Sequence, residues 1–287
     1  MITNATDNHP DFLYHYTSFE TLALILNNRT ICFNSLQNVD DLEEEKTKDM
    51  GNFGKYIYVS CWTKDKKEDM ALWSMYTPNM HGIRIGLPQY PFKKYYYKQG
   101  DFGLERDTET YINIDKVYNE NQGNIDPCYP ELIEVQYTND VNMLFPTVKK
   151  SNEPELAERF LKGEQIRKEV KLLFNLSYTY GNIGKYKRSI WGFQNEWRYV
   201  LPIMPFGMQE LLNSSIEKKQ ELMMRINDLQ TKRPYNMFFL ELDENAVREM
   251  QILLGPRLSK AEKIYVKSLL KEHGLEKNCQ ESSLTIR

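Results

Sequence analysis

Side chains in residues 13–17 alternate between two sets, as they do along a β-strand. Tyr14 and Tyr16 share one face, and His15 lies on the opposite face. The alternation therefore predicts a strand that carries a single histidine. The alternative interpretation is a tyrosine-rich core strand whose histidine is held by one hydrogen bond.

The hydrophobic period changes directly after this strand. Apolar residues recur at helical spacing over residues 19–26, which predicts a helix. Thr17 and Glu20 fit the capping box, so we expect the helix to begin at Thr17. His15 then lies two residues before a helix N-terminus, where free backbone amides and the helix dipole favour an anionic ligand.

The same two periods predict the other elements of the chain. Strands are expected at residues 30–34, 56–62, 82–87, 132–137, 195–201, 236–242 and 250–254, with an edge strand at 283–286. Helices are expected at 69–76, 152–177 and 259–273, with a helix or helical hairpin over 209–231. The acidic stretch 38–45 is predicted to be a turn that leads into a helix on a solvated face, and the alternative is a loop bordering a cleft.

Strands and helices follow one another irregularly, and several strands are neighbours in the sequence. This order favours an α+β fold with a mixed, largely antiparallel sheet and peripheral helices. Residues 88–130 show little periodicity and are predicted to be an irregular excursion from the sheet. Because no linker or repeat divides the chain, we expect one domain over residues 1–287.

Composition narrows the class of protein. With 41% hydrophobic and 27% charged residues, the chain is typical of globular proteins. The net charge of -3 provides no overall basic surface for nucleic acid. No apolar run approaches the roughly 20 residues that cross a bilayer, and the polar start lacks a secretion signal. We therefore expect a cytoplasmic protein without a membrane partner, whose four widely spaced cysteines are reduced and form no metal site.

A second stretch with candidate chemistry lies near residue 196. If residues 194–200 form a strand, then Gln194, Glu196 and Arg198 share one face. A carboxylate between an amide and a guanidinium is expected on a buried face only if these groups are paired or face a site. The alternative is a Glu196–Arg198 ion pair on a solvated face of the sheet.

These motifs together resemble a bacterial family built on a domain of unknown function. The resemblance is carried by Tyr-His-Tyr-Thr at 14–17, Val-Ser-Cys-Trp at 59–62, Trp-Ser-Met-Tyr at 73–76 and Gln-Asn-Glu-Trp-Arg at 194–198, in the family's order. The chain departs from the family at 39–42, where an Asp-Pro pair is usual, and at Gln194, where the family usually has a glutamate.

The chain resembles the ADP-ribosyltransferases more distantly. The order of His15, then Tyr76 or Ser60, then Gln194-x-Glu196 is similar to theirs. The resemblance implies a split sheet and an NAD-consuming enzyme that needs no metal. It also implies a toxin or defence effector whose ADP-ribose acceptor is a nucleic acid or a protein.

The resemblance also implies a role for each candidate residue. Glu196 would bind the ribose 2-hydroxyl as the bond to nicotinamide breaks, since oxocarbenium character strengthens that hydrogen bond. His15 would act beside Glu196 in catalysis. His15, Tyr16 and Thr17 would bind the dinucleotide, and Trp73 or Tyr76 would stack on the nicotinamide ring. Ser60 or Tyr76 would supply the hydroxyl that comes between the histidine and the glutamate in the family's motif order. Gln194 would orient the acceptor, and Arg198 would hold Glu196 or bind a phosphate.

Two other classes of function stay open. One is a non-catalytic module that binds a nucleotide or a protein in an aromatic cleft. The other is a nuclease or hydrolase that uses His15, Glu196 and a lysine from residues 178–188. The catalytic hypothesis predicts that His15 and Glu196 lie on neighbouring strands and face one cleft with Trp73 or Tyr76. Placement of the two residues on opposite faces of the sheet would count against it.

Overall fold

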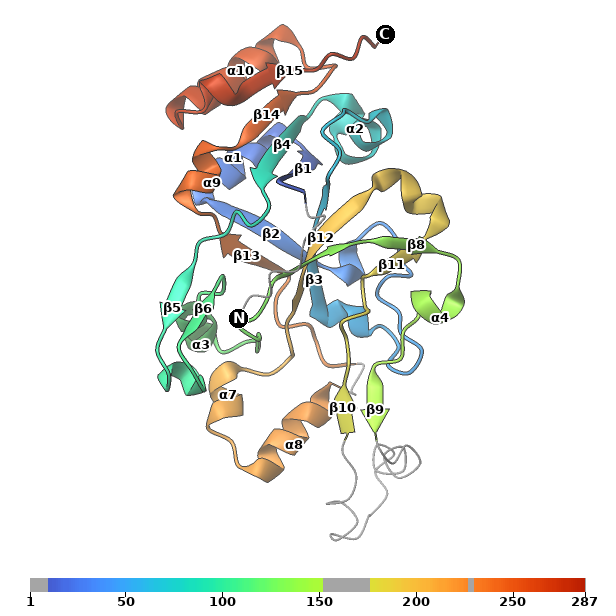
Figure 1. The fold of residues 1–287 in the computed structure, drawn as a ribbon, viewed down its shortest axis with the longest axis vertical. Coiled ribbons are helices and arrows are strands. Elements are labelled where there is room, and N and C mark those ends of the chain that lie inside the picture. The colour runs from blue at the N-terminus through green and yellow to red at the C-terminus, as the bar shows by residue number, and fades with distance from the viewer. Residues whose placement is uncertain (1–9, 152–175, 227–229, 287) are drawn as a thin grey trace.

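The computed structural model describes residues 10–151, 176–226 and 230–286. The fold is α+β, as predicted, and is built on a nine-stranded, mostly antiparallel sheet (Figure 1). The strands of this sheet are β1 (Phe12–Thr17), β2 (Thr30–Ser35), β3 (Ile57–Thr63), β4 (Ile83–Pro88), β7 (Glu131–Glu134), β12 (Glu196–Pro202), β13 (Met237–Glu241), β14 (Gln251–Leu254) and β15 (Cys279–Glu281).

Shorter strands and helices surround this sheet. Three two-stranded pairs are β5 (Tyr95–Tyr97) with β6 (Thr108–Thr110), β8 (Gln136–Thr138) with β11 (Tyr186–Arg188), and β9 (Lys149–Ser151) with β10 (Leu176–Tyr178). The α-helices are α1 (Phe19–Asn28), α2 (Met70–Tyr76), α3 (Ile114–Glu120), α4 (Val141–Leu144), α7 (Met208–Leu212), α8 (Ile216–Arg225), α9 (Glu244–Arg248) and α10 (Lys260–Glu272). Among the described residues, no helix is long and apolar enough to cross a membrane.

The sheet branches at β3. One edge of β3 pairs with β12 along its whole length, from Thr63 opposite Glu196 to Ile57 opposite Pro202. The other edge pairs with β2 at residues 58–59 and with β1 at Thr63, opposite Tyr14. Residues 60–62 therefore lie between two strands that leave β3 in different directions. Figure 1 shows β1 and β4 running into the upper part of the molecule while β2 and β13 cross its centre.

Alternation along the strands gives the sheet two packed faces. Leu13 of β1, Phe33 of β2 and Tyr199 of β12 belong to one large core cluster, and each is at most 1% exposed. Val59 of β3 and Val200 of β12 belong to a second cluster on the opposite face. Because both faces of β3 are covered, its near-continuous apolar run predicts its central position correctly.

Helix starts follow local hydrogen-bond chemistry. Helix α10 begins at the predicted capping box, in which Ser259 and Glu262 bond each other's backbone amides. Helix α1 is capped by Ser18 and not by Thr17, which corrects the prediction. Thr17 is the last residue of β1 and pairs with Ile83 of β4, so its backbone belongs to the sheet.

Several predicted elements differ from those observed. Residues 39–45 form turns and not the predicted helix, and the Asp41 carboxylate accepts a hydrogen bond from the Glu43 amide at 3.0 Å. The edge strand is β15, parallel to β14, and residues 283–286 form no strand. The region 88–130 contains β5, β6 and α3, and residues 132–137 divide between β7 and β8. The helix predicted over 152–177 falls almost entirely outside the described residues.

The strand that carries His15 should depend on its core leucine. Leu13 is 0% exposed within the large cluster, so Leu13→Ala is expected to lower the free energy of unfolding by about 2–5 kcal/mol. The matched control is Leu24→Ala, because Leu24 is 60% exposed and loses little packing. Urea unfolding at neutral pH measures both changes, and equal effects would contradict this account of the core.

Candidate functional site

A cavity of about 570 Å³ lies at the point where β1 and β2 separate from β3. Its volume is within the range of small-molecule sites. The three residues of β3 between the two pairings, Ser60, Cys61 and Trp62, all line it. The strand order that splits the sheet thus also creates the cavity.

His15 bridges the two diverging strands. Its Nδ1 lies 2.8 Å from the backbone carbonyl oxygen of Cys61 on β3. The imidazole ring also packs against Trp62, with 5.2 Å between ring centroids. The side chain therefore occupies the seam where regular pairing between β1 and β3 has stopped.

The partner of His15 determines its tautomer. A carbonyl only accepts hydrogen bonds, so Nδ1 carries the proton and Nε2 keeps a lone pair when the ring is neutral. Burial lowers the pKa of His15 below its ordinary value, and the Cys61 carbonyl opposes this only in part. His15 is therefore a neutral hydrogen-bond acceptor at pH 7.

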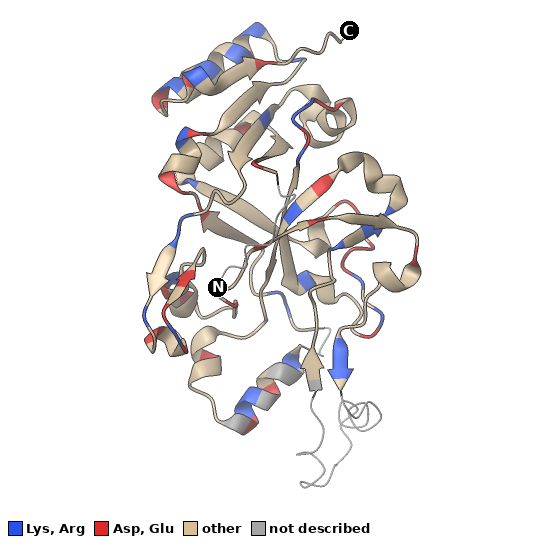
Figure 2. Ribbon diagram, viewed as in Figure 1, with Lys and Arg blue, Asp and Glu red and all other residues tan. Residues whose placement is uncertain are grey.

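Four buried charges form a cluster at one wall of the cavity, on β12, β11 and the turns before β3. We call Glu44, Lys187, Glu196 and Arg198 the charge cluster. Lys187 Nζ lies 3.2 Å from Glu44 Oε1 and 3.1 Å from Glu196 Oε2. Arg198 donates to both carboxylates and to the Gly184 carbonyl at 3.0 Å. Figure 2 shows acidic and basic residues side by side on β12 at the centre of the sheet.

Glu196 is held as an ionised carboxylate. Its Oε1 accepts from Arg198 Nε at 2.8 Å, and its backbone amide donates to the Tyr137 hydroxyl at 2.9 Å. Burial raises the pKa of Glu196, but the charges of Arg198 and Lys187 outweigh burial, and the net shift is downward. The same ion pairs raise the pKa of Lys187 against the effect of its burial.

A hydrogen-bonded chain connects this cluster to the edge of the cavity. Gln194 Oε1 accepts from Lys187 Nζ at 2.8 Å, and Gln194 Nε2 donates to the Tyr76 hydroxyl at 2.5 Å. Tyr76 in turn is hydrogen-bonded to Asp40, and burial followed by the Asp40 charge raises its pKa. Because the ammonium only donates, the orientation of the Gln194 amide is determined.

Most of the residues predicted from sequence meet at this cavity. The lining residues among them are His15, Tyr16, Ser60, Tyr76, Gln194, Glu196 and Arg198. Trp73 does not line it, since Trp73 is 0% exposed, packs edge-on against Tyr16 and donates to Glu68 at 3.1 Å. Thr17 is buried in the pairing of β1 with β4 and does not line the cavity either.

His15 and Glu196 line the same cavity but come from different strands of the sheet. The prediction of neighbouring strands is wrong, because β1 and β12 both pair with β3 at Thr63, from opposite edges, and are separated by that strand. The register places Tyr14, Thr63 and Glu196 on one face of the sheet. His15 alternates with Tyr14, so it projects from the opposite face, which is the placement that counts against the catalytic hypothesis. His15 nevertheless lines the same cavity as Glu196, because its ring lies in the seam where β1 leaves β3.

Within the charge cluster, Glu44 and Lys187 were not identified individually from sequence. Glu44 is buried and lines the cavity, so the alternative prediction of an acidic loop bordering a cleft describes this segment better than a solvated face. Lys187 falls in the range 178–188 from which a lysine was expected to join Glu196 in a hydrolase. Nothing in the local pattern separates Glu44 from Glu43 or Glu45, because their different environments arise from tertiary contacts.

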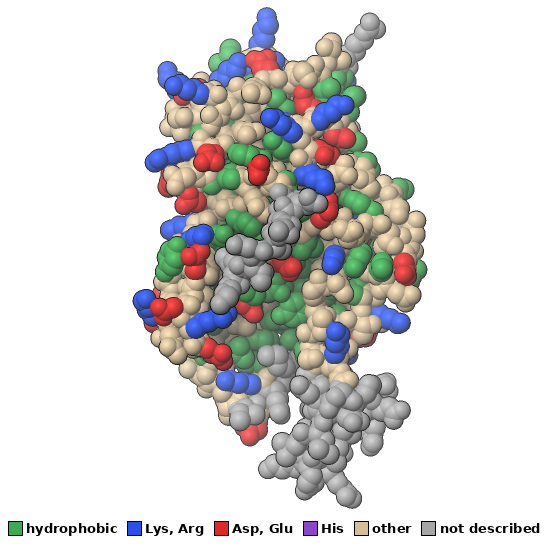
Figure 3. Space-filling view, in the orientation of Figure 1, with side chains coloured by type: hydrophobic (Ala, Val, Ile, Leu, Met, Phe, Trp, Pro, Cys, Tyr) green, Lys and Arg blue, Asp and Glu red, His purple; other side chains and the backbone are tan. Residues whose placement is uncertain are grey.

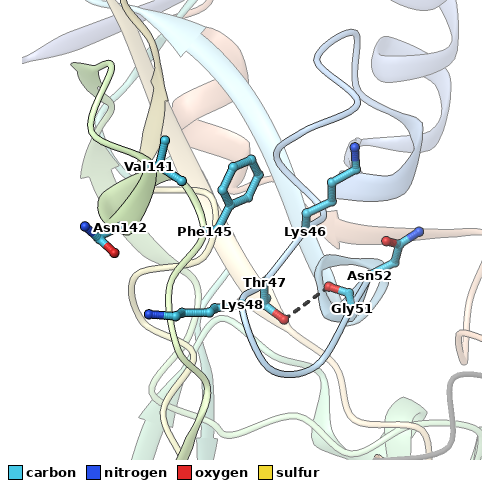
Figure 4. Close-up of a pocket in the computed structure, with 8 residues that line it drawn as sticks. All are labelled: Lys46, Thr47, Lys48, Gly51, Asn52, Val141, Asn142 and Phe145. Carbon is cyan, nitrogen blue, oxygen red and sulfur yellow. Dashed lines mark hydrogen bonds between the residues drawn. The ribbon is translucent and has the colours of Figure 1, made fainter.

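A second pocket, of about 420 Å³, lies between the segment 46–52 and α4 (Figure 4). Phe145 and Val141 form its apolar wall, and the Thr47 hydroxyl donates to the Gly51 carbonyl at 3.1 Å. None of the residues predicted from sequence lines this pocket. Figure 3 shows acidic and basic side chains interspersed over one face of the molecule, with no extended region of one sign.

Groups of three or more metal-binding side chains do not occur within the part of the chain that the structure describes. Comparison of the chain with protein-family models, with curated proteins and with solved structures found no match.

The neutral state of His15 predicts a pH dependence of stability. Because the folded-state pKa lies below 6.5, the unfolded chain binds the proton more readily as the pH falls below that value. The wild type should lose stability between pH 7.5 and pH values below 6.5, and His15→Gln should lose less over the same interval. Urea unfolding at several pH values measures this, with His273→Gln outside the cavity as the control. An identical pH dependence in His15→Gln and wild type would contradict a neutral His15.

The charge cluster predicts that Lys187 contributes more to the free energy of unfolding than its neighbour Arg188 does. Lys187→Met leaves the two carboxylates with only Arg198, so we expect a loss of about 3–5 kcal/mol in the free energy of unfolding. Arg188→Met is the matched control, because the side chains of Arg188 and Glu43 are 37% and 34% exposed. The control should lose much less stability. Equal losses in urea unfolding would show that burial does not govern these ion pairs.

Proposed function

We propose that the cavity binds NAD and that the protein is an ADP-ribosyltransferase-like enzyme that cleaves the bond between nicotinamide and ribose. One observation carries this proposal. An ionised, buried glutamate, a neutral imidazole with an accepting Nε2 and a tyrosine line one cavity at the branch of the sheet. These residues come from three separate parts of the chain, in the order His15, Tyr76, Glu196.

The reaction suits this arrangement. Positive charge develops on the ribose as the carbon–nitrogen bond breaks, and a carboxylate close to the 2-hydroxyl strengthens its hydrogen bond as the charge grows. Glu196 supplies that carboxylate, and its low pKa keeps it ionised. Nε2 of His15 accepts a hydrogen bond from a ribose hydroxyl. Tyr76, which is 36% exposed, provides an aromatic face for the nicotinamide ring.

Arg198 and Gln194 act through their neighbours. Arg198 is 0% exposed and bonds both buried carboxylates, so it holds Glu196 in place and does not reach a phosphate. Gln194 joins Lys187 to Tyr76 and fixes the position of the phenol. The bacterial family with the Tyr-His-Tyr-Thr motif is the one to which we assign the chain under this proposal.

A second candidate is a non-catalytic module that binds a nucleotide. The observation in its favour is that Arg198 and Lys187 together bond both carboxylate oxygens of Glu196. Cations at this position weaken the electrostatic help that a carboxylate gives to a developing positive charge. Saturable stabilisation by NAD in a thermal-shift measurement, without nicotinamide release, would identify this second function. Metal-dependent nicking of nucleic acid would instead favour the hydrolase that uses Lys187.

The proposed function predicts nicotinamide release. Incubation with NAD should release nicotinamide, and Glu196→Gln should lower the rate by about 10²–10³-fold because the amide lacks the negative charge. Chromatography of the released nicotinamide measures the rate. Glu134→Gln, on the neighbouring strand β7 and in an exposed ion pair with Lys64, is the control and should retain the wild-type rate. Absence of release by the wild type, with nucleic acid and protein acceptors supplied, would refute the proposed function.

A further inference from the structure

One oxygen atom of the charge cluster is left without a hydrogen bond. Glu44 Oε2 accepts from Arg198, but no donor among the described residues makes a hydrogen bond to Glu44 Oε1. Oε1 lies 3.2 Å from Lys187 Nζ, as an ion pair only. The Glu44 side chain is 2% exposed and lines the cavity. A buried carboxylate oxygen in this situation keeps a lone pair for a donor that enters the cavity.

The other two residues that could bind the acceptor, Gln194 and Glu196, already use both of their polar atoms in hydrogen bonds. Gln194, which the sequence predicts to orient the acceptor, uses its carbonyl for Lys187 and its amino group for Tyr76. An amide is also unable to take a proton at neutral pH. Glu196 accepts from Arg198 at one oxygen and from Lys187 at the other. Glu44 is thus the carboxylate of the cluster with an oxygen that accepts no hydrogen bond from the described residues.

Lys187 places the two carboxylates side by side. Its ammonium lies 3.1 Å from Glu196 Oε2 and 3.2 Å from Glu44 Oε1. A ribose positioned on Glu196 is therefore close to Glu44 as well. Both carboxylates are paired with Lys187 and Arg198, but only Glu44 has an oxygen that accepts no hydrogen bond from the described part of the chain. With two carboxylates at one site, one can stabilise the developing charge while the other accepts a proton.

We propose that Glu44 is the general base that deprotonates the nucleophile attacking the ribose, an inference that rests on the proposed cleavage of NAD. The oxygen of the nucleophile forms a bond to the anomeric carbon while the bond from that carbon to the nicotinamide nitrogen breaks. The bonding electron pair moves to the ring nitrogen and cancels its positive charge. The proton of the nucleophile passes to Glu44 Oε1 and from there to solvent.

The test uses azide as a nucleophile that needs no base. With water as the acceptor, Glu44→Ala should release nicotinamide from NAD about 10²–10⁴-fold more slowly than the wild type. Sodium azide carries no proton to remove, so it should restore release in Glu44→Ala and give ADP-ribosyl azide as the product. Glu196→Gln should not be rescued, because it lacks the charge that stabilises the ribose cation. Glu43→Ala is the matched control in the same acidic segment and should keep the wild-type rate.

The outcomes separate this inference from the function on which it rests. If the wild type releases nicotinamide but Glu44→Ala keeps its rate or is not rescued by azide, Glu44 is not the base and the proposed function stands. If the wild type releases none, the proposed function fails and the base assignment fails with it. Glu44→Gln keeps the volume and an oxygen for Arg198, so it repeats the rescue test if Glu44→Ala does not fold. Rescue by azide is not expected from a residue whose role is only structural.

Discussion

The burial of four charges at the centre of the sheet is the constraint on which the site depends. Ionised groups removed from water are tolerated only when they are paired and hydrogen-bonded. Glu44, Lys187, Glu196 and Arg198 satisfy this requirement together, with two charges of each sign. The cluster thereby joins the acidic turns near residue 44, strand β11 and strand β12 into one wall of the cavity.

The branching of β3 is the second constraint. A strand has two edges, and β3 gives one to β12 and divides the other between β2 and β1. Regular pairing cannot continue through the division, so the Cys61 carbonyl takes the His15 imidazole as its partner. The cavity and the tautomer of His15 both follow from this interruption of the sheet.

These two constraints meet at Thr63, which is paired with Tyr14 on one side and Glu196 on the other. The proximity of the Tyr-His-Tyr-Thr strand to the Gln-Asn-Glu-Trp-Arg strand is thus a property of sheet order. The hydrogen bonds from Gln194 to Tyr76 and from Tyr76 to Asp40 extend the polar wall of the cavity to α2 and to the acidic turns. A ligand in the cavity would contact groups held by backbone pairing and by buried ion pairs, and both kinds of support limit side-chain motion.

Periodicity in the sequence by itself determined the α+β class, most of the strands and the shared face of Glu196 and Arg198 on β12. Gln194, which was predicted to lie on the same strand, instead ends the 3-10 helix Ser189–Gln194 before β12. Alternation puts Glu196 and Arg198 on the same face of any strand that contains both, because they are two residues apart. The tertiary structure alone decided that Lys187 and Glu44 complete the cluster and that Trp73 is buried away from the cavity. It also moved the cap of α1 from Thr17 to Ser18, since the sheet takes Thr17. The physical reason is that partners of buried charges and the end of strand pairing depend on contacts between residues far apart in the sequence, which local patterns do not encode.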